Sequence, residues 1–245
     1  MDPYRRLDPL KIVETANRLH DRVAERFPGS GLSAVAADVV RVTGVTVRRA
    51  RSVERPYWAL NGLVLMVILA GAGAEAWLAQ RFGWAVLGHR AEPLSLAQGI
   101  DSAFNLFLLT AGGAWFLLTL EARWKRQRIQ RWLNELRAFA HVVDMHQLTK
   151  DPTAQDGPRT TSSPDRAMTR YEITRYLDYC AEILALTGKL AAIYAGATQD
   201  HLAISAAGDV ENLTSDLNRK VWQKIMILAE QRNPAGEGAG ELRTR

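Results

Sequence analysis

The sequence predicts an all-α membrane protein, and three observations lead to this fold class. Residues 57–80 and 102–120 are two apolar stretches that contain a single charged residue, Glu75. Each is close to the roughly 20 apolar residues that a helix needs to cross a bilayer. Basic residues gather next to only one end of each stretch. Elsewhere apolar residues recur every three or four positions, which is the spacing of one helix face.

The basic residues predict the orientation of the two spans. Nine of them lie just before the first stretch or just after the second: Arg48, Arg49, Arg51, Arg55, Arg123, Lys125, Arg126, Arg128 and Arg131. The connecting residues 81–99 carry only Arg81 and Arg90. Because basic flanks stay on the cytoplasmic side, we expect a transmembrane hairpin with both termini in the cytoplasm. The first apolar stretch begins too far along the chain for a cleavable signal peptide.

In chain order, the sequence divides into six segments. They are N-terminal cytoplasmic helices (1–55), a transmembrane hairpin (56–121, with spans near 57–80 and 100–120), a cytoplasmic stalk helix (122–150), a flexible linker (151–167), a C-terminal helical hairpin (168–232) and a disordered tail (233–245). The linker is rich in proline, serine and threonine, and the tail is rich in glycine. Such compositions do not support a packed core.

Two helices are expected before the membrane. Asp8 followed by Pro9 is a typical helix start, with an N-cap carboxylate and proline in the first turn. The first helix then has an apolar stripe: Ile12, Ala16, Leu19 and Val23. Residues 27–31 interrupt it. A second helix is predicted from Ser33 toward Arg51, with Val35, Val39, Val42 and Val45 near one face.

The second span has no stop signal at its end. Neither proline nor glycine occurs between Leu120 and Thr149. One helix is therefore predicted from near Leu96 to near Leu148, roughly 75 Å long at 1.5 Å per residue. Its second half would project into the cytoplasm as a stalk.

The C-terminal segment predicts two amphipathic helices that form a hairpin or a coiled-coil surface. Their apolar residues step at close to 3.5: Ile173, Leu177, Cys180, Leu184, Thr187 and Leu190, then Val210, Leu213, Leu217, Val221, Ile225 and Leu228. Tyr176, Ile183 and Tyr194 lie beside the first stripe. Because Cys180 is on this stripe and is the sole cysteine, we expect a core side chain rather than a nucleophile.

Three polar residues lie near the external end of the predicted spans. Glu75, Asp101 and Asn105 would be at similar depth in antiparallel spans, and an intramembrane charge suggests a functional site by default. Two interpretations stay open: the three residues line a pore mouth, or Glu75 reaches the interface or packs against Asn105. The small-residue runs 70–74 and 111–114 favour close helix contact, either between chains, around a pore, or between the two spans of one chain.

The stretch RWKRQRIQRW (123–132) mixes basic and aromatic residues, as nucleic-acid-binding segments do. Here it directly follows a membrane span, where anionic headgroups attract each basic residue by about 1 kcal/mol. The residues Arg123, Lys125, Arg126, Arg128 and Arg131 are therefore assigned to lipid headgroups, and no nucleic-acid partner is expected.

The stretch 141–146 contains His141, Asp144 and His146, side chains that can hold metals or move protons. On a helix, His141 lies about 60° from Asp144 but about 140° from His146 around the axis. The spacing is also not that of HExxH, and a second ligand set is missing. We expect no metal, cofactor or catalytic site here. Helix-end polarity, a pH-sensitive contact between helices, or a histidine ring in an oligomer remain the interpretations.

Three stretches resemble segments of uncharacterised bacterial two-span membrane proteins: RLHDRVAERFPGSGLS (18–33), AHVVDMHQLTKDP (140–152) and YLDYCAEILALTGKLAAIYA (176–195). The resemblance implies a bacterial inner-membrane location and no particular activity. The layout is also similar to predicted two-span effectors of bacterial defence systems, in architecture alone.

The leading hypothesis for function is a non-enzymatic, homo-oligomeric inner-membrane protein that anchors or couples a cytoplasmic assembly. Its cytoplasmic helices would bind each other or a protein partner. The alternatives are an oligomeric ion-conducting pore or two-span effector, and a metal-dependent enzyme that uses the histidines.

Overall fold

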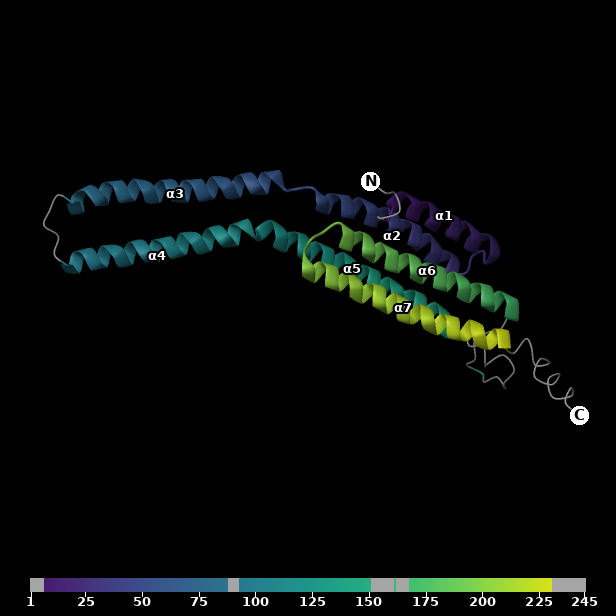
Figure 1. Cartoon of the computed structure of the whole chain (residues 1–245). Helices are drawn as coiled ribbons and strands as arrows, with labels where there is room; N and C mark the ends of the chain where they lie inside the picture. The colour runs from purple at the N-terminus through teal and green to yellow at the C-terminus, as the bar shows by residue number, and fades with distance from the viewer. Residues whose placement is uncertain (1–6, 88–92, 151–160, 162–167, 231–245) are drawn as a thin grey trace, which may run out of the picture. The chain divides into compact units, whose positions relative to one another are not determined.

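The computed structural model describes residues 7–87, 93–150, 161 and 168–230, and over these residues the chain forms helices and no strand. Seven helices occur in the described chain: α1 (Pro9–Arg26), α2 (Gly31–Glu54), α3 (Trp58–Leu87), α4 (Pro93–Leu118), α5 (Leu120–Leu148), α6 (Arg170–Gly196) and α7 (His201–Glu230) (Figure 1). The predicted all-α class is therefore confirmed. The predicted tail, and the predicted linker apart from residue 161, lie outside the described residues.

The chain divides into two compact units. Residues 55–127 form the hairpin unit, which contains α3, α4 and the first turns of α5. The N-terminal 54 residues and residues 128–245 form the five-helix unit, which contains α1, α2, most of α5, α6 and α7. The sequence treated the N-terminal helices, the stalk and the C-terminal hairpin as separate segments, whereas their apolar stripes share one core.

Helix α1 begins as the sequence predicts. The Asp8 carboxylate accepts a hydrogen bond of 2.9 Å from the backbone N–H of Leu10, and Pro9 occupies the first helical position. The predicted stripe is buried along its whole length: Ile12, Ala16, Leu19 and Val23. The break after α1 contains Gly29 at φ 67°, a left-handed conformation that glycine adopts without steric cost.

Helix α2 extends further than predicted, from Gly31 to Glu54, and its buried face differs. Val35 and Val39 are buried, but Val42 and Val45 are only half-buried. The buried face continues instead through Thr43, Thr46, Val47, Ala50 and Val53. These positions follow the 3.6-residue period of an α-helix. Val39, Val42 and Val45 are spaced by three residues, less than one turn, so each lies further around the helix from the buried face.

The sequence predicted α5 as a stalk that projects from the membrane, and the structure places most of its length in the five-helix unit. The long helix is first interrupted at Thr119, although the Arg123 N–H still donates to the Thr119 carbonyl at 3.1 Å. From residue 128 onward, one face of α5 belongs to the core of the five-helix unit: Ile129, Leu133, Leu136, Ala140 and Val143. The apolar pattern of this segment therefore reflects burial against other helices.

Helix α6 is the central helix of the five-helix unit. The predicted stripe residues of α6, including Cys180, are buried, and so are those of α7 except the half-buried Leu213. Consecutive helices α6 and α7 pack side by side and run antiparallel (Figure 1). On its other sides α6 meets α1, through an ion pair between Arg22 and Glu182, and α5, through Trp132 and Tyr194.

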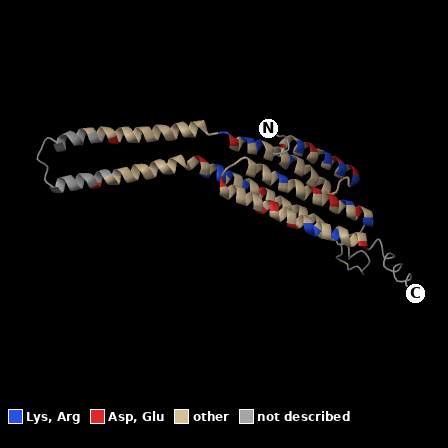
Figure 2. Ribbon diagram, in the orientation of Figure 1, with Lys and Arg blue, Asp and Glu red and all other residues tan. Residues whose placement is uncertain are grey.

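The two helices of the hairpin unit, α3 and α4, lie side by side and expose much of their apolar surface. Figure 2 shows their described parts as almost free of charged residues. Large exposed side chains occur on both: Leu63, Leu65, Met66, Leu69, Phe107, Leu109 and Leu118. Among the described residues, one helical stretch within Gly31–Trp77 is long and apolar enough to cross a membrane. Only 6% of its apolar 18-residue segment is buried.

The start of α6 predicts a measurable dependence on pH. Thr169 and Glu172 form a capping box, in which Glu172 accepts from the Thr169 backbone at 2.7 Å and Thr169 Oγ1 accepts from the Glu172 N–H. The Thr169 hydrogen bonds lower the pKa of Glu172. A carboxyl with a lowered pKa stabilises the folded state above its unfolded pKa, and this contribution disappears as pH falls through the folded pKa. At pH 7 the unfolding temperature of the wild type should be higher than that of Glu172→Gln, and this difference should disappear in acid. A difference that stays constant with pH would contradict this role.

Candidate functional site

Glu75 is half-buried in the hairpin unit and has a partner that the sequence did not identify. Thr110 Oγ1 on α4 donates a hydrogen bond to Glu75 Oε1 on α3. Asp101 and Asn105, which the sequence grouped with Glu75, are exposed and interact with each other, with Asn105 Nδ2 donating to Asp101 Oδ2 at 3.3 Å. These four described side chains therefore form two pairs, one between α3 and α4 and one along α4.

The glycines of the small-residue runs are not packed inside the chain. A Cβ atom added at Gly71, Gly73, Gly112 or Gly113 would meet nothing within 4 Å among the described residues. Close packing between α3 and α4 of one chain thus does not explain these glycines. Contact with another chain and a pore lining, the other two interpretations, stay predictions.

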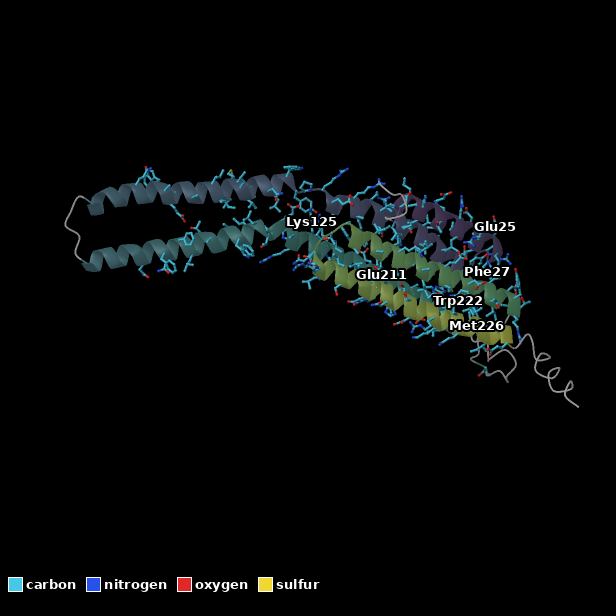
Figure 3. All side chains as sticks on the ribbon, in the orientation of Figure 1. Glu25, Phe27, Lys125, Glu211, Trp222 and Met226 are labelled. Carbon is cyan, nitrogen blue, oxygen red and sulfur yellow. The ribbon has the colours of Figure 1, made fainter. Side chains whose placement is uncertain are left out.

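The basic residues after the second span differ in their surroundings. Lys125 (Figure 3) is half-buried, with its ammonium 2.7 Å from Glu121 and 5.3 Å from the centre of the Tyr57 ring. The hydrogen bond from Lys125 is the main cause that lowers the pKa of Glu121, and hydrogen bonds from the Asn61 side chain and then the Tyr57 backbone N–H lower it further. Lys125 therefore joins the first turn of α5 to the start of α3.

The other predicted headgroup contacts are more accessible. Arg123 is exposed and its guanidinium lies 4.9 Å from the centre of the Phe116 ring, a cation–π contact at the end of an apolar helix. Arg128 and Arg131 are exposed on α5, and Arg126 is half-buried. Arg123, Arg128 and Arg131 are therefore the exposed members of the set, whereas Arg126, like Lys125, is half-buried.

The structure separates the members of the histidine-containing stretch. His141 is exposed, while Asp144 is half-buried and accepts a hydrogen bond from Gln147 Nε2. His146 lies against the start of α2, so close that a Cβ at Gly31 would come within 2.6 Å of its ring. No group of three or more His, Cys, Asp or Glu residues among the described positions could hold a metal ion.

The end of α5 contacts the other helices of the five-helix unit. The Lys224 ammonium on α7 donates to the Gln147 carbonyl at 2.9 Å, and Lys150 lies 5.1 Å from the centre of the Tyr176 ring on α6. The contact of His146 with α2 adds a third neighbour. Residues 141–150 thus lie where α5 meets α2, α6 and α7.

Cys180 has the surroundings of a core residue. Its side chain is fully buried, and this burial raises the pKa of the thiol to about 12. Because the thiolate is the nucleophilic form, a raised pKa makes the thiol unreactive at neutral pH.

A polar cluster between α2, α5 and α6 is a feature that the sequence did not indicate. Trp132 stacks on Tyr194, with ring centroids 5.5 Å apart and planes at 27°, and the Arg49 guanidinium lies 5.2 Å from the indole centre. Arg49 also pairs with Glu135, and Tyr194 Oη donates to Thr46 Oγ1 at 3.4 Å. These residues are far apart in sequence, and each alone looks like an ordinary stripe or surface residue.

No protein-family model matches this chain, and neither a curated protein nor a solved structure gives a significant match.

Proposed function

We propose that this chain is a two-span bacterial inner-membrane protein that forms homo-oligomers and has no enzymatic activity. The hairpin unit would anchor the assembly, and the five-helix unit would bind a protein partner or couple a signal in the cytoplasm. The observation that carries the proposal is the contrast between the two units. The five-helix unit buries its apolar stripes in one core, whereas α3 and α4 leave large apolar side chains exposed.

A bilayer is the environment that fits this exposed surface. Apolar surface in water costs about 25 cal/mol per Å², and soluble monomers rarely expose large contiguous apolar patches. The absence of charge along most of α3 and α4 also suits hydrocarbon.

The charge distribution supports an orientation with both termini in the cytoplasm. Nine basic residues flank the cytoplasmic ends of the proposed spans, whereas the connecting residues carry two, Arg81 and Arg90. Arg123, Arg126, Arg128 and Arg131 would meet anionic lipid headgroups there. Lys125 would contribute mainly through its ion pair with Glu121.

The proposed oligomer would form through the glycines of the spans. Gly71, Gly73, Gly112 and Gly113 have open space beside them within the chain. Small residues let helix backbones from neighbouring chains approach closely in lipid. Exposed Trp222 and Met226 on α7 (Figure 3) offer the five-helix unit an apolar contact for a cytoplasmic partner.

Mass measurement in mild detergent tests this proposal. The wild-type protein should have the mass of an oligomer, and the double variant Gly71→Leu/Gly112→Leu should shift toward monomer because bulky side chains prevent close helix approach. Gly62→Leu is the matched control, since Gly62 also has open space but lies outside the small-residue runs. A monomeric wild-type protein, or identical behaviour of all three proteins, would contradict the proposal.

An oligomeric pore is the second candidate, and the pair of Glu75 and Thr110 is the observation that favours it. A carboxylate hydrogen-bonded between two apolar helices can interact with permeating cations. In reconstituted bilayers, Glu75→Gln should reduce cation selectivity, while Asp101→Asn should have a smaller effect because Asp101 is exposed beside Asn105. The absence of current from folded wild-type protein would exclude this candidate.

A further inference from the structure

A small pocket lined by both polar and apolar side chains opens between α2, α5 and α6 in the five-helix unit. Its volume is about 110 Å³, and Arg41, Thr46, Arg49, Trp132, Glu135 and Tyr194 are among its lining residues. Two of these polar side chains are almost completely buried: Tyr194 has 0% of its surface exposed and Thr46 has 1%. Buried hydroxyls normally have hydrogen-bond partners. A donor or acceptor of these hydroxyls that has no partner in the protein therefore indicates which ligand group the pocket can bind.

A hydrogen bond between two buried hydroxyls ends at this pocket with an unused donor. Tyr194 Oη donates to Thr46 Oγ1 at 3.4 Å. Within the described chain, the Thr46 hydroxyl has no acceptor for its own hydrogen. The pocket therefore presents a donor that lacks an acceptor.

The two arginines add further donors. Arg49 uses Nη1 for Glu135, and Arg41 uses Nε and Nη2 for Asp38. A guanidinium has five N–H donors, so one carboxylate does not use them all. The side chains of Glu135 and Asp38 are 58% and 54% exposed, whereas that of Arg49 is 31% exposed. Water therefore screens Glu135 more than Arg49, whereas the Arg41 side chain, 69% exposed, lies at the outer edge of the pocket.

Size and chemistry together select a class of ligand. A water molecule occupies about 30 Å³ in the liquid, so the pocket has room for a group of a few heavy atoms and not for a nucleotide. Arginine forks and hydroxyls are the donors that bind phosphate and carboxylate oxygens. We propose that this pocket binds a phosphate-sized oxyanion, held by Thr46, Arg41 and Arg49.

Binding of inorganic phosphate to the full-length protein in lipid-free detergent tests this site. Isothermal titration at constant ionic strength, with chloride as the reference salt, should show one saturable site per chain. Thr46→Val removes the terminal donor at nearly constant volume, and loss of one hydrogen bond to a charged group corresponds to about a tenfold weaker affinity. Arg41→Gln should weaken binding similarly. Arg49 is left unchanged because its loss would also remove a contact of Trp132.

Thr43→Val is the matched control. Thr43 is equally buried on α2 but does not line the pocket, and its hydroxyl has no partner among the described residues. This variant should bind phosphate as the wild type does. Equal loss in Thr43→Val and Thr46→Val would overturn the proposal, as would the lack of any anion-specific binding.

A second arm distinguishes a free anion from a lipid phosphate. Mixed micelles with phosphatidylglycerol replace inorganic phosphate in the same titration, with phosphatidylcholine micelles as the reference. A Thr46-dependent signal in either arm supports the site, and the arm that responds identifies the source. Signals in both arms that are insensitive to Thr46→Val and Arg41→Gln would place phosphate elsewhere and exclude this pocket.

Discussion

Replacing Leu136 with alanine is expected to lower the free energy of unfolding of the five-helix unit by about 2–5 kcal/mol. Leu136 is 1% exposed and belongs to the core that α5 shares with the N-terminal and C-terminal helices. The substitution removes apolar contacts and leaves a cavity that the neighbouring helices fill only in part. Denaturant titration in mild detergent, followed by circular dichroism, measures the change.

The control for this prediction is Met145→Ala on the same helix. Met145 is 66% exposed, so its truncation should change the stability by less than about 0.5 kcal/mol. A free-standing stalk would instead make both substitutions nearly neutral. If Leu136→Ala were as stable as Met145→Ala, the packing of α5 in the five-helix unit would be refuted.

Replacing Gly188 with leucine is the second substitution with a large expected effect, a loss of about 3 kcal/mol. A Cβ atom at Gly188 on α6 would lie 2.7 Å from Thr214 Oγ1 on α7. Thr214 is buried and β-branched, so its side chain has few alternative rotamers. A whole leucine side chain would force α6 and α7 apart along their interface. The unfolding midpoint in denaturant measures the loss.

Gly208→Leu provides the comparison, because Gly208 on α7 has nothing within 4 Å of an added Cβ. Leucine favours helix over glycine by roughly 0.8 kcal/mol, so this variant should be slightly more stable than the wild type. Stabilisation by both substitutions would show that α6 and α7 are not in close contact at Gly188.

The helix stripes that local periodicity predicts are those that pack in the structure. Asp8 caps α1 as predicted, and the apolar stripes of α1, α6 and α7 are buried almost without exception. On α2 the predicted face from Val39 to Val45 was partly wrong, because these valines are three residues apart and do not follow the 3.6-residue period. Threonines at 43 and 46 are buried there, and a search for apolar residues alone does not find them.

The candidate sites depend on tertiary contacts more than the helix stripes do. The partner of Glu75 is Thr110 rather than Asn105, because the pairing of two antiparallel helices depends on their relative rotation. The pocket around Thr46 and Tyr194 brings together side chains 148 positions apart. Periodicity along one helix contains no information about such pairs.

The sequence by itself determined the helical class, the position of the two apolar stretches and the stripe of each amphipathic helix. These properties depend on the chemistry of residues within a few turns of one another, through capping, propensity and the 3.6-residue period. Only the tertiary structure decided that α5 is a core helix, that the span glycines lack neighbours within the chain, and that hydroxyls and arginines converge between α2, α5 and α6. An apolar stripe establishes that a helix face needs a partner, but the partner is selected by packing between segments distant in sequence.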